Sequence, residues 1–271
     1  MNIDCIIDRI NTPNNEPDDY IDEESGLLYC GKCHTAKQKH GDGMLSGKIL
    51  YITCKCKEEA MEREKQEAEA KRIEELRKRC LPLDNMRRHT FSTASDAKHI
   101  QIARRYVDQW EEMRKNGSGL VFWGNTGSGK SYAAQSIANG LIDKGIPVEY
   151  TTAADLVSNL LDREISRREY KDKLCSAPLL VVDDIGAERS TDFAREQICN
   201  VIDARTESGK PLIATTNYAL AEMQEANDPA LARIFDRLLG ACVPVRVVGE
   251  SRRKIENVSR LETARRLLAV D

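Results

Sequence analysis

A short stretch of the chain combines glycine, lysine and serine at a spacing that suits an anionic ligand. Residues 119–131 read Gly-Leu-Val-Phe-Trp-Gly-Asn-Thr-Gly-Ser-Gly-Lys-Ser, so an apolar run enters a turn that contains three glycines. Glycine permits backbone angles that direct successive N–H groups toward one point, where they and a following helix N-terminus attract a phosphate. Lys130 adds a full charge for the β- and γ-phosphates, and the hydroxyl of Ser131 is a ligand for Mg²⁺. The predicted nucleotide-binding residues are Gly124, Asn125, Thr126, Gly127, Ser128, Gly129, Lys130 and Ser131.

Two adjacent aspartates, Asp183 and Asp184, follow the apolar run 177–182 and form a second candidate site. A further apolar run, 211–215, leads into Asn217. Ligands of open α/β sheets bind at the carboxyl ends of the strands, so these polar residues are expected beside the glycine-rich turn. There Asp183 would hold Mg²⁺, usually through water, while Asp184 would orient or deprotonate the attacking water. Asn217 would hydrogen-bond that water or the γ-phosphate, although Asn is also common at strand ends for purely local reasons.

Cysteine pairs near the amino terminus form a third cluster. Of nine cysteines, four are grouped as Cys30-x-x-Cys33 and Cys54-x-Cys56, and each pair has the short spacing of a metal knuckle. The glycine-containing segment between the pairs can fold back, which predicts a closed site with four cysteine ligands for Zn²⁺. His34 or His40 could replace one cysteine, and four unrelated surface thiols are the ordinary alternative.

The metal would be needed to keep residues 25–56 folded, because this segment contains too few apolar side chains to form a core of its own. The remaining cysteines are dispersed and are interpreted as small apolar residues. They are Cys5, Cys80, Cys175, Cys199 and Cys242.

A parallel α/β sheet is needed to position the phosphate loop and the polar strand ends. Apolar runs alternate with helical patterns, and the glycine-rich turn lies between a predicted strand and a helix that begins near Tyr132, which argues against a chance turn. Thr152 and Asp155 resemble a helix-starting capping box. Strands are predicted at 120–123, 147–150, 177–182, 211–215 and 243–248, with helices near 100–113, 132–141, 156–161, 193–202 and 231–239 and a short C-terminal helix.

Composition and charge describe a helix-rich chain of several parts. Its 271 residues are 31% charged and 5% aromatic, and the net charge of −3 gives no overall attraction to nucleic acid. Residues 57–79 alternate acidic and basic side chains without apolar heptads, which favours a solvated helical spacer over a coiled coil. We therefore expect a zinc-binding module at 1–56, a linker at 57–80 and an ATPase domain at 81–271. Neither a signal peptide nor a membrane-spanning run is predicted, which favours a cytoplasmic protein.

Four motifs occur in an order that resembles the DnaC-type helicase loaders, AAA+ ATPases close to the ATP-binding helpers of IstB-type transposition. They are Gly-Asn-Thr-Gly-Ser-Gly-Lys-Ser, Leu-Leu-Val-Val-Asp-Asp-Ile-Gly-Ala-Glu, Lys-Pro-Leu-Ile-Ala-Thr-Thr-Asn and Arg-Ile-Phe-Asp-Arg-Leu, within residues 91–254. The cysteine pairs are similar to the zinc-binding N-terminus of loaders from Gram-positive bacteria and their phages. The resemblance implies a P-loop AAA+ fold with a five-stranded parallel sheet, preceded by a small zinc-binding module.

The same resemblance implies partners and further site residues. The N-terminal module would bind a replicative DnaB-type hexameric helicase, and the ATPase domain would assemble with ATP and single-stranded DNA into a spiral oligomer that opens the helicase ring. Arg237 corresponds to the arginine finger, with Arg233 in reserve, and Arg253 corresponds to the second sensor arginine, with Arg252 as its rival. Asp184 stands where many AAA+ proteins have Glu, which implies slow hydrolysis suited to a switch, and the chain ends too soon after Arg253 for a full helical lid.

Two other functions remain open at this stage. A transposase helper would use the same ATPase to recruit a different partner, and a small-molecule kinase would use the same phosphate loop. A basic run between two strands could line a central channel and contact the phosphates of single-stranded DNA. Acidic residues interleave with it, so a solvated helix face is at least as good an interpretation. The run contains Arg163, Arg167, Arg168, Lys171 and Lys173.

Overall fold

The structure, a computed structural model, describes residues 15–162, 164, 166–186, 191–249 and 265–268. The chain divides into two compact units, Met1–Arg72 and Ile73–Asp271, hereafter the cysteine unit and the sheet unit. Their boundary falls inside one long helix, α2 (Lys55–Cys80). In the described ranges, no helix has the length and apolar character needed to cross a membrane.

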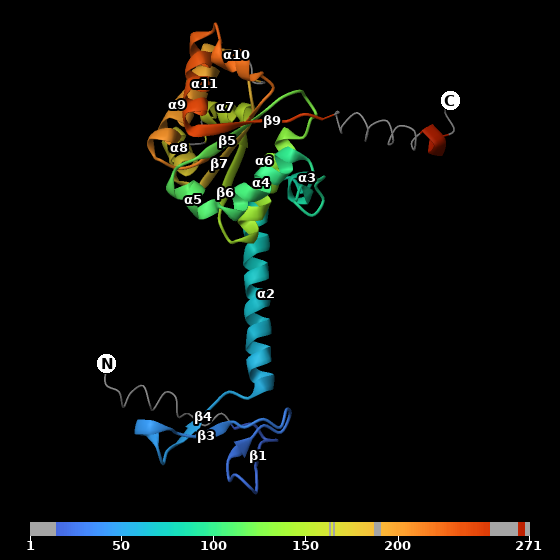
Figure 1. Cartoon of the computed structure of the whole chain (residues 1–271), viewed down its shortest axis with the longest axis vertical. Coiled ribbons are helices and arrows are strands. Elements are labelled where there is room, and N and C mark those ends of the chain that lie inside the picture. The colour runs from blue at the N-terminus through green and yellow to red at the C-terminus, as the bar shows by residue number, and fades with distance from the viewer. Residues whose placement is uncertain (1–14, 163, 165, 187–190, 250–264, 269–271) are drawn as a thin grey trace. The chain divides into compact units, whose positions relative to one another are not determined.

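A five-stranded parallel sheet forms the centre of the sheet unit, as predicted (Figure 1). The strand order is β6-β7-β8-β5-β9, so the strand that leads into the phosphate loop lies between two others. The strands are β5 (Gly119–Trp123), β6 (Val148–Thr152), β7 (Leu179–Ile185), β8 (Leu212–Thr216) and β9 (Cys242–Arg246). The strands β5, β7 and β8 are almost wholly buried, because they are central in the sheet and helices cover both faces of a parallel sheet.

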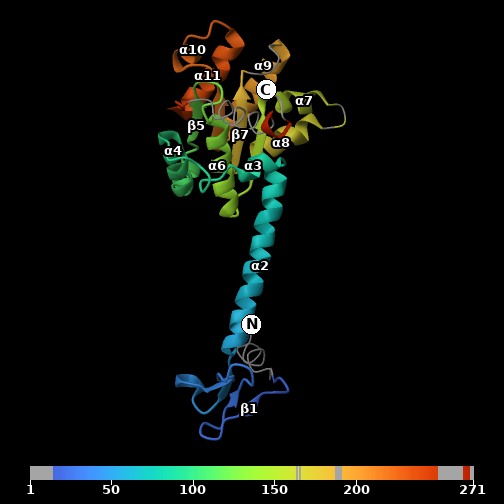
Figure 2. The same ribbon diagram turned by 90° about the vertical axis from the view of Figure 1, so that its right-hand side faces the viewer.

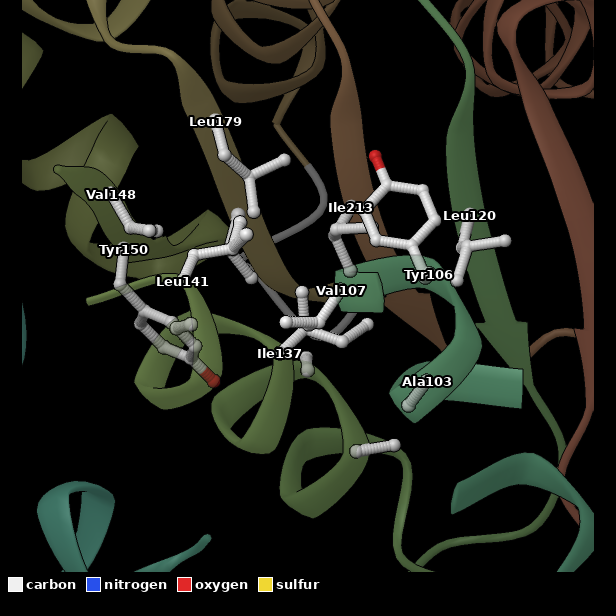
Figure 3. Close-up of a cluster of buried hydrophobic side chains, with 14 of the residues drawn as sticks. Ala103, Tyr106, Val107, Leu120, Ile137, Leu141, Val148, Tyr150, Leu179 and Ile213 are labelled. Carbon is white, nitrogen blue, oxygen red and sulfur yellow. The ribbon is translucent and has the colours of Figure 1, made fainter. Parts of the chain in front are cut away.

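Helices cover both faces of this sheet (Figure 1, Figure 2). Side chains alternate between the faces: Leu120 and Phe122 of β5 join one apolar cluster with α4 and α6, while Val121 joins the other with α7, α9 and α11. Part of the first cluster is drawn in Figure 3. The helices are α3 (Asp84–Arg88), α4 (Lys98–Asp108), α5 (Trp110–Lys115), α6 (Lys130–Asp143), α7 (Ala153–Leu161), α8 (Arg167–Ser176), α9 (Asp192–Glu207), α10 (Leu220–Gln224) and α11 (Pro229–Ala241).

Several predicted elements differ from those observed: the strand expected at 243–248, for example, is Cys242–Arg246. The helix expected near 100–113 is broken into α4 and α5 at Gln109, whose backbone (φ −96°, ψ 21°) leaves the helical region. Strand β7 was expected to end before the aspartates, but it continues through Asp183 and Asp184 to Ile185. The predicted N-cap is confirmed, because the hydroxyl of Thr152 accepts a hydrogen bond from the Asp155 N–H at the start of α7, and the Thr152 hydroxyl donates to the Asp155 carboxylate at 2.8 Å.

A buried arginine fixes the far ends of the strands that carry the site. Arg205 of α9 is fully buried, and its guanidinium donates to the carbonyls of Pro178 and Pro211, the residues just before β7 and β8. It also donates to the carbonyl of Ala177. Burial lowers the pKa of this guanidinium to about 10, and a cation surrounded by carbonyl oxygens remains protonated at neutral pH.

The predicted spacer 57–79 is helical and lies within α2, which is longer at both ends. Helix α2 carries exposed ion pairs such as Lys55–Glu59 and Arg72–Glu69, as the alternating charges of the sequence indicate. The helix ends at Cys80, immediately before Leu81-Pro82, where proline disfavours a helical residue ahead of it.

Short strands form the cysteine unit: β1 (Tyr20–Ile21), β2 (Leu28–Tyr29), β3 (Gln38–His40) and β4 (Ile49–Tyr51), with a 3₁₀ turn η1 (Gly43–Leu45). They pair as two separate antiparallel ribbons, β1 with β2 and β3 with β4. The side chains of Lys37 and Asp19 form an ion pair that is shielded from water. Two-stranded ribbons are marginal by themselves, so this unit requires a further source of stability.

Candidate functional site

The phosphate loop lies between β5 and α6, where its glycines adopt left-handed backbone angles. Gly124, Gly127 and Gly129 have φ values of 141°, 80° and 105°. At Gly124 a side chain is also excluded sterically, since a Cβ there would come within 2.3 Å of the Val247 carbonyl oxygen. Gly129 is the N-cap of α6, so the first turn of that helix opens toward the loop.

Lys130 and Asn217 are brought together in this structure. The Lys130 ammonium is buried and donates to Asn217 Oδ1 at 2.7 Å and to the carbonyls of Gly124 and Asn125, each at 2.9 Å. The side chain thus spans the loop and the end of β8. Ser128 Oγ is also buried, with no hydrogen-bond partner among the described residues. A buried hydroxyl and a buried ammonium inside a curled loop suit the oxygens of a polyphosphate.

A β-bulge shapes the aspartate pair. Val182 pairs with Ala214 and Ile185 with Thr216, so two residues of β7 lie opposite one residue of β8. Asp184 takes up the extra length with a left-handed backbone angle (φ 57°), which Asp tolerates better than most residues. Strict alternation would have placed its side chain in the apolar cluster that contains Val182, but Ile185 occupies that cluster in its place.

Asp183 is 5% exposed, and each carboxylate oxygen accepts a hydrogen bond. Tyr150 OH donates to Oδ2 at 2.6 Å, and Thr215 Oγ1 donates to Oδ1. The N–H of Asp184 donates to Thr215 Oγ1 at 2.8 Å. Sequence reasoning missed Tyr150 and Thr215, because their hydroxyls reach the carboxylate only through the strand order and the bulge.

A cavity of about 170 Å³ adjoins the phosphate loop. The Arg246 guanidinium, at the end of β9, lies 5.5 Å from the centre of the Trp123 ring, and both residues line the cavity. The other lining residues are Gly124, Asn125, Asn217, Ala219, Val247 and Val248. Arg246 was not predicted, and its signal in the sequence is weak, since an arginine at the end of an edge strand is ordinary.

The arginines named from the family resemblance divide into two groups. Arg237 and Arg233 lie on α11, and both ion-pair with Asp203 of α9, at 2.8 and 3.5 Å. Among the described residues, Arg237 therefore pairs with Asp203 and not with its sequence neighbour Asp236, while Glu250 lies outside the described residues. Arg252 and Arg253 lie outside the described residues. Of the short C-terminal helix, residues 265–268 are described and are helical.

The predicted basic run is only partly described, because Arg163 lies outside the described residues. Its other members lie on α8. Arg168 ion-pairs with Asp172, and Lys173 binds Glu149 at 2.6 Å. Carboxylates thus neutralise part of this surface, which favours the solvated helix face over a phosphate track.

The four clustered cysteines converge in the cysteine unit. The sulfur atoms of Cys30, Cys33, Cys54 and Cys56 all lie within 4.8 Å of one another, as a tetrahedral metal site requires. The histidine alternatives are not part of this group: the His34 ring bonds Tyr20 OH at 3.1 Å, and His40 lies on β3.

Thr35 connects the two cysteine pairs. Its hydroxyl lies 3.1 Å from Cys33 Sγ and accepts the Lys55 N–H at 3.0 Å. The hydrogen bond from Thr35 lowers the pKa of the Cys33 thiol to about 6. Cys56 lies in the first turn of α2, and its contacts with the sulfur atoms of Cys33, Cys54 and Cys30 raise the pKa of its thiol to about 12. Four thiols at such short range suit a divalent cation, which removes the repulsion between thiolates.

Comparisons with known proteins agree with this fold. Residues 46–259 match the family described as "IstB-like ATP binding protein". The chain is 25% identical to the replicative helicase loader DnaI of Bacillus subtilis, over 87% of this chain and 81% of that protein. It is 30% identical to the replicative helicase loader DnaC of Escherichia coli, over 51% of this chain and 56% of that protein.

Among solved structures, a crystal structure of DnaI superposes with a TM-score of 0.54 at 23% identity, covering 63% of this chain and 93% of the other. A crystal structure of the DnaC helicase loader gives 0.53 at 24%, covering 61% and 100%. These similarities establish the AAA+ fold of the sheet unit. Since the matched family covers most of the sequence and includes every element of the phosphate site, the chain belongs to the IstB-like ATP-binding proteins.

Proposed function

We propose that this chain loads a replicative DnaB-type hexameric helicase onto single-stranded DNA and uses ATP hydrolysis as a switch. The observation that carries the proposal is the extent of the similarity to DnaI, which covers 87% of the chain. The sheet unit alone is too short to account for that share, so the similarity includes part of the cysteine unit as well. A loader needs both an ATPase and a helicase-binding module, and this chain has a candidate for each.

The phosphate loop would bind ATP. Lys130 would exchange its carbonyl contacts for the β- and γ-phosphates, and the loop N–H groups would surround the same oxygens. The first turn of α6 would add the favourable end of its dipole. Asn217, already bonded to Lys130, would lie close to the γ-phosphate.

Mg²⁺, when bound, neutralises charge on the phosphates and fixes their orientation. Ser131 and Asp183 would hold it, Ser131 directly and Asp183 through water. Asp184 would orient or deprotonate the attacking water, and the bulge keeps its carboxylate out of the apolar cluster. A carboxylate shorter than that of Glu has less reach toward this water, so slow hydrolysis is expected, with stimulation by single-stranded DNA.

Arg237 would act on the ATP of a neighbouring copy. It is 54% exposed, so its guanidinium is accessible from outside the subunit although it ion-pairs with Asp203. Hydrolysis would then depend on assembly into an ATP-dependent oligomer, with Arg253 as a sensor of the subunit's own nucleotide. The cysteine unit, folded around Zn²⁺, would bind the helicase.

A loading assay on closed circular single-stranded DNA tests the proposal. A hexameric helicase cannot thread such a circle without ring opening, so unwinding of an annealed strand should require the helicase, this chain and ATP together. The same reaction with Lys130→Ala should show no loading. Failure of the wild-type chain to bind the helicase from its own genome, or to promote loading, would reject the proposal.

The family description favours one second candidate, a helper ATPase of an IstB-like transposition system. The two functions share the ATP site and differ in the protein bound by the cysteine unit. Affinity purification from the native lysate distinguishes them, since a loader should retain a hexameric helicase and a transposition helper a transposase. Recovery of a transposase without a helicase would favour the second function.

A further inference from the structure

We propose that Tyr150 and Thr215 are positioning residues of the ATP site, which together hold the Asp183 carboxylate in the orientation that binds hydrated Mg²⁺. The inference rests on the ATPase part of the proposed function. It concerns two hydroxyls on the strands β6 and β8, which flank the strand that carries Asp183.

Asp183 is buried in the sheet unit. A carboxylate that is 5% exposed has lost most of its hydration and needs hydrogen-bond donors from the protein. Its two oxygens receive one hydroxyl each, from opposite neighbours in the sheet. Rotation of the carboxylate about its last bond would break both hydrogen bonds at once. Each oxygen still has a second lone pair, which is available to a metal-bound water.

Thr215 has a second contact that connects it to Asp184. It lies opposite the bulge, where the regular ladder between β7 and β8 is interrupted. The Asp184 N–H, displaced from the ladder, donates to Thr215 Oγ1, and the same hydroxyl donates to Asp183. One fully buried threonine side chain therefore sets the position of both aspartates.

Tyr150 is oriented by its own neighbours. Gln135 Nε2 of α6 donates to Tyr150 OH at 3.1 Å, so the one phenolic proton of Tyr150 is directed to Asp183. The Gln135 amide is fixed at its other end, where Oε1 bonds the His89 ring. Burial, followed by the charge of Asp183, raises the pKa of Tyr150 well above its usual value, so the phenol keeps its proton and remains a donor.

These contacts distinguish Tyr150 from a residue that only fills the core. Figure 3 shows Tyr150 of β6 and Tyr106 of α4 in the same apolar cluster. Tyr106 is also buried and also donates one hydrogen bond, but its acceptor is the Ser118 carbonyl at 2.9 Å. Tyr106→Phe is therefore a matched control, since it removes a buried hydroxyl from the same cluster without affecting Asp183.

The test measures metal binding apart from turnover. Each purified full-length variant, loaded with a non-hydrolysable ATP analogue, is titrated with Mn²⁺ and followed by electron paramagnetic resonance. Tyr150→Phe and Thr215→Val should each raise the half-saturating Mn²⁺ concentration about tenfold, the effect expected when a carboxylate loses one hydrogen bond. Affinity for the analogue in EDTA should stay within about twofold of wild type, because the loop and Lys130 are unchanged.

Two further variants separate positioning from stability. Thr215→Ser keeps the hydroxyl and should bind Mn²⁺ as wild type does, while Tyr106→Phe should lower the melting temperature without changing the titration. Unchanged Mn²⁺ binding in both Tyr150→Phe and Thr215→Val would overturn the inference, and so would an equal effect in Tyr106→Phe. A wild-type chain that binds no ATP analogue would instead reject the proposed function.

Discussion

The cysteine unit and the sheet unit differ in what supports their polar groups. In the sheet unit two apolar clusters pack against opposite faces of the sheet. The site residues lie at the carboxyl ends of its central strands. In the described part of the cysteine unit, the residues most shielded from water are few, and two of them belong to the cysteine cluster. They are Leu27, Leu28, Cys30, Lys37, Gly41 and Cys54.

This difference predicts that the bound ligand contributes little to the folding of the sheet unit and much to the folding of the cysteine unit. The ATP site is built on a core that exists without nucleotide, so loss of the ligand should leave the fold intact. The part of the cysteine unit that the structure describes lacks such a core, so the free energy of metal binding would be much of its folding free energy. A change confined to one unit should therefore leave the other unit unaffected.

Metal removal should have the largest effect. Purified protein should contain one zinc per chain, and Cys33→Ser should lose the metal, the structure of the cysteine unit and binding to the helicase. ATP binding and the melting transition of the sheet unit should be unchanged, because Cys33 lies outside it. Elemental analysis, hydrogen exchange and a nucleotide titration measure these outcomes.

Cys175→Ser is the control for that experiment, since Cys175 is partly exposed on α8 and belongs to no metal cluster in the described residues. It should keep the zinc. A wild-type chain that is free of metal and nevertheless folded in the cysteine unit would contradict the comparison between the two units.

Lys130→Ala should abolish ATP binding while the sheet unit remains folded. The substitution removes the charge that faces the phosphates but leaves both apolar clusters as they are, and the affinity should fall at least about 100-fold. Fluorescence titration with a labelled nucleotide measures the loss. Lys144→Ala is the control. Lys144 follows the other end of α6, and its ammonium donates to the Val107 carbonyl of α4. Equal loss in both variants would contradict a specific phosphate contact.

Much of the fold could be predicted because its signals are local. The glycine-rich loop needs particular backbone angles, and the apolar runs of β7 and β8 need burial on both faces, so each is legible in a few consecutive residues. The cysteine spacing is likewise local, and the four sulfur atoms converge as the spacing indicates.

The contacts of the site residues were harder to predict because they depend on the order of the strands in the sheet and on their register. The hydroxyl of Thr215 meets Asp183 only because of the bulge in β7, and Tyr150 meets it only because β6 is the neighbouring strand. The partner of Arg237 is similarly non-local: Asp203 lies on another helix, and its distance along the chain gave no indication of contact. Periodicity predicts which face a side chain occupies, but not which polar atom it meets there.

Arg237→Ala should reduce ATPase activity by somewhat less than the ~10³-fold typical of an arginine finger. The variant has an intact ATP site, whereas Lys130→Ala retains the arginine without binding nucleotide. Each variant alone should be nearly inactive under conditions of assembly, with helicase or single-stranded DNA present. In mixtures some interfaces pair a good ATP site with a good arginine, so activity should reappear.

Arg233→Ala serves as the comparison, since Arg233 also ion-pairs with Asp203 but is only the second candidate for the arginine finger. It should retain most of the activity. No recovery, in assemblies demonstrated to contain both variants, would mean that Arg237 acts within its own subunit or has no role in hydrolysis.

Removal of the Thr152 cap should have the smallest effect, and it tests whether the two units unfold independently. Thr152→Ala deletes the hydroxyl that accepts the Asp155 N–H, which should cost the sheet unit about 1 kcal/mol. For a unit of this size the melting temperature should fall by roughly 2–4 °C. Zinc release on heating, followed with a chelating dye, reports the cysteine unit and should occur at the wild-type temperature. Thr152→Ser keeps the cap and should melt as wild type does. If zinc release moved together with the melting of the sheet unit, the two units would unfold as one, because a change confined to α7 reaches the metal site only through such coupling.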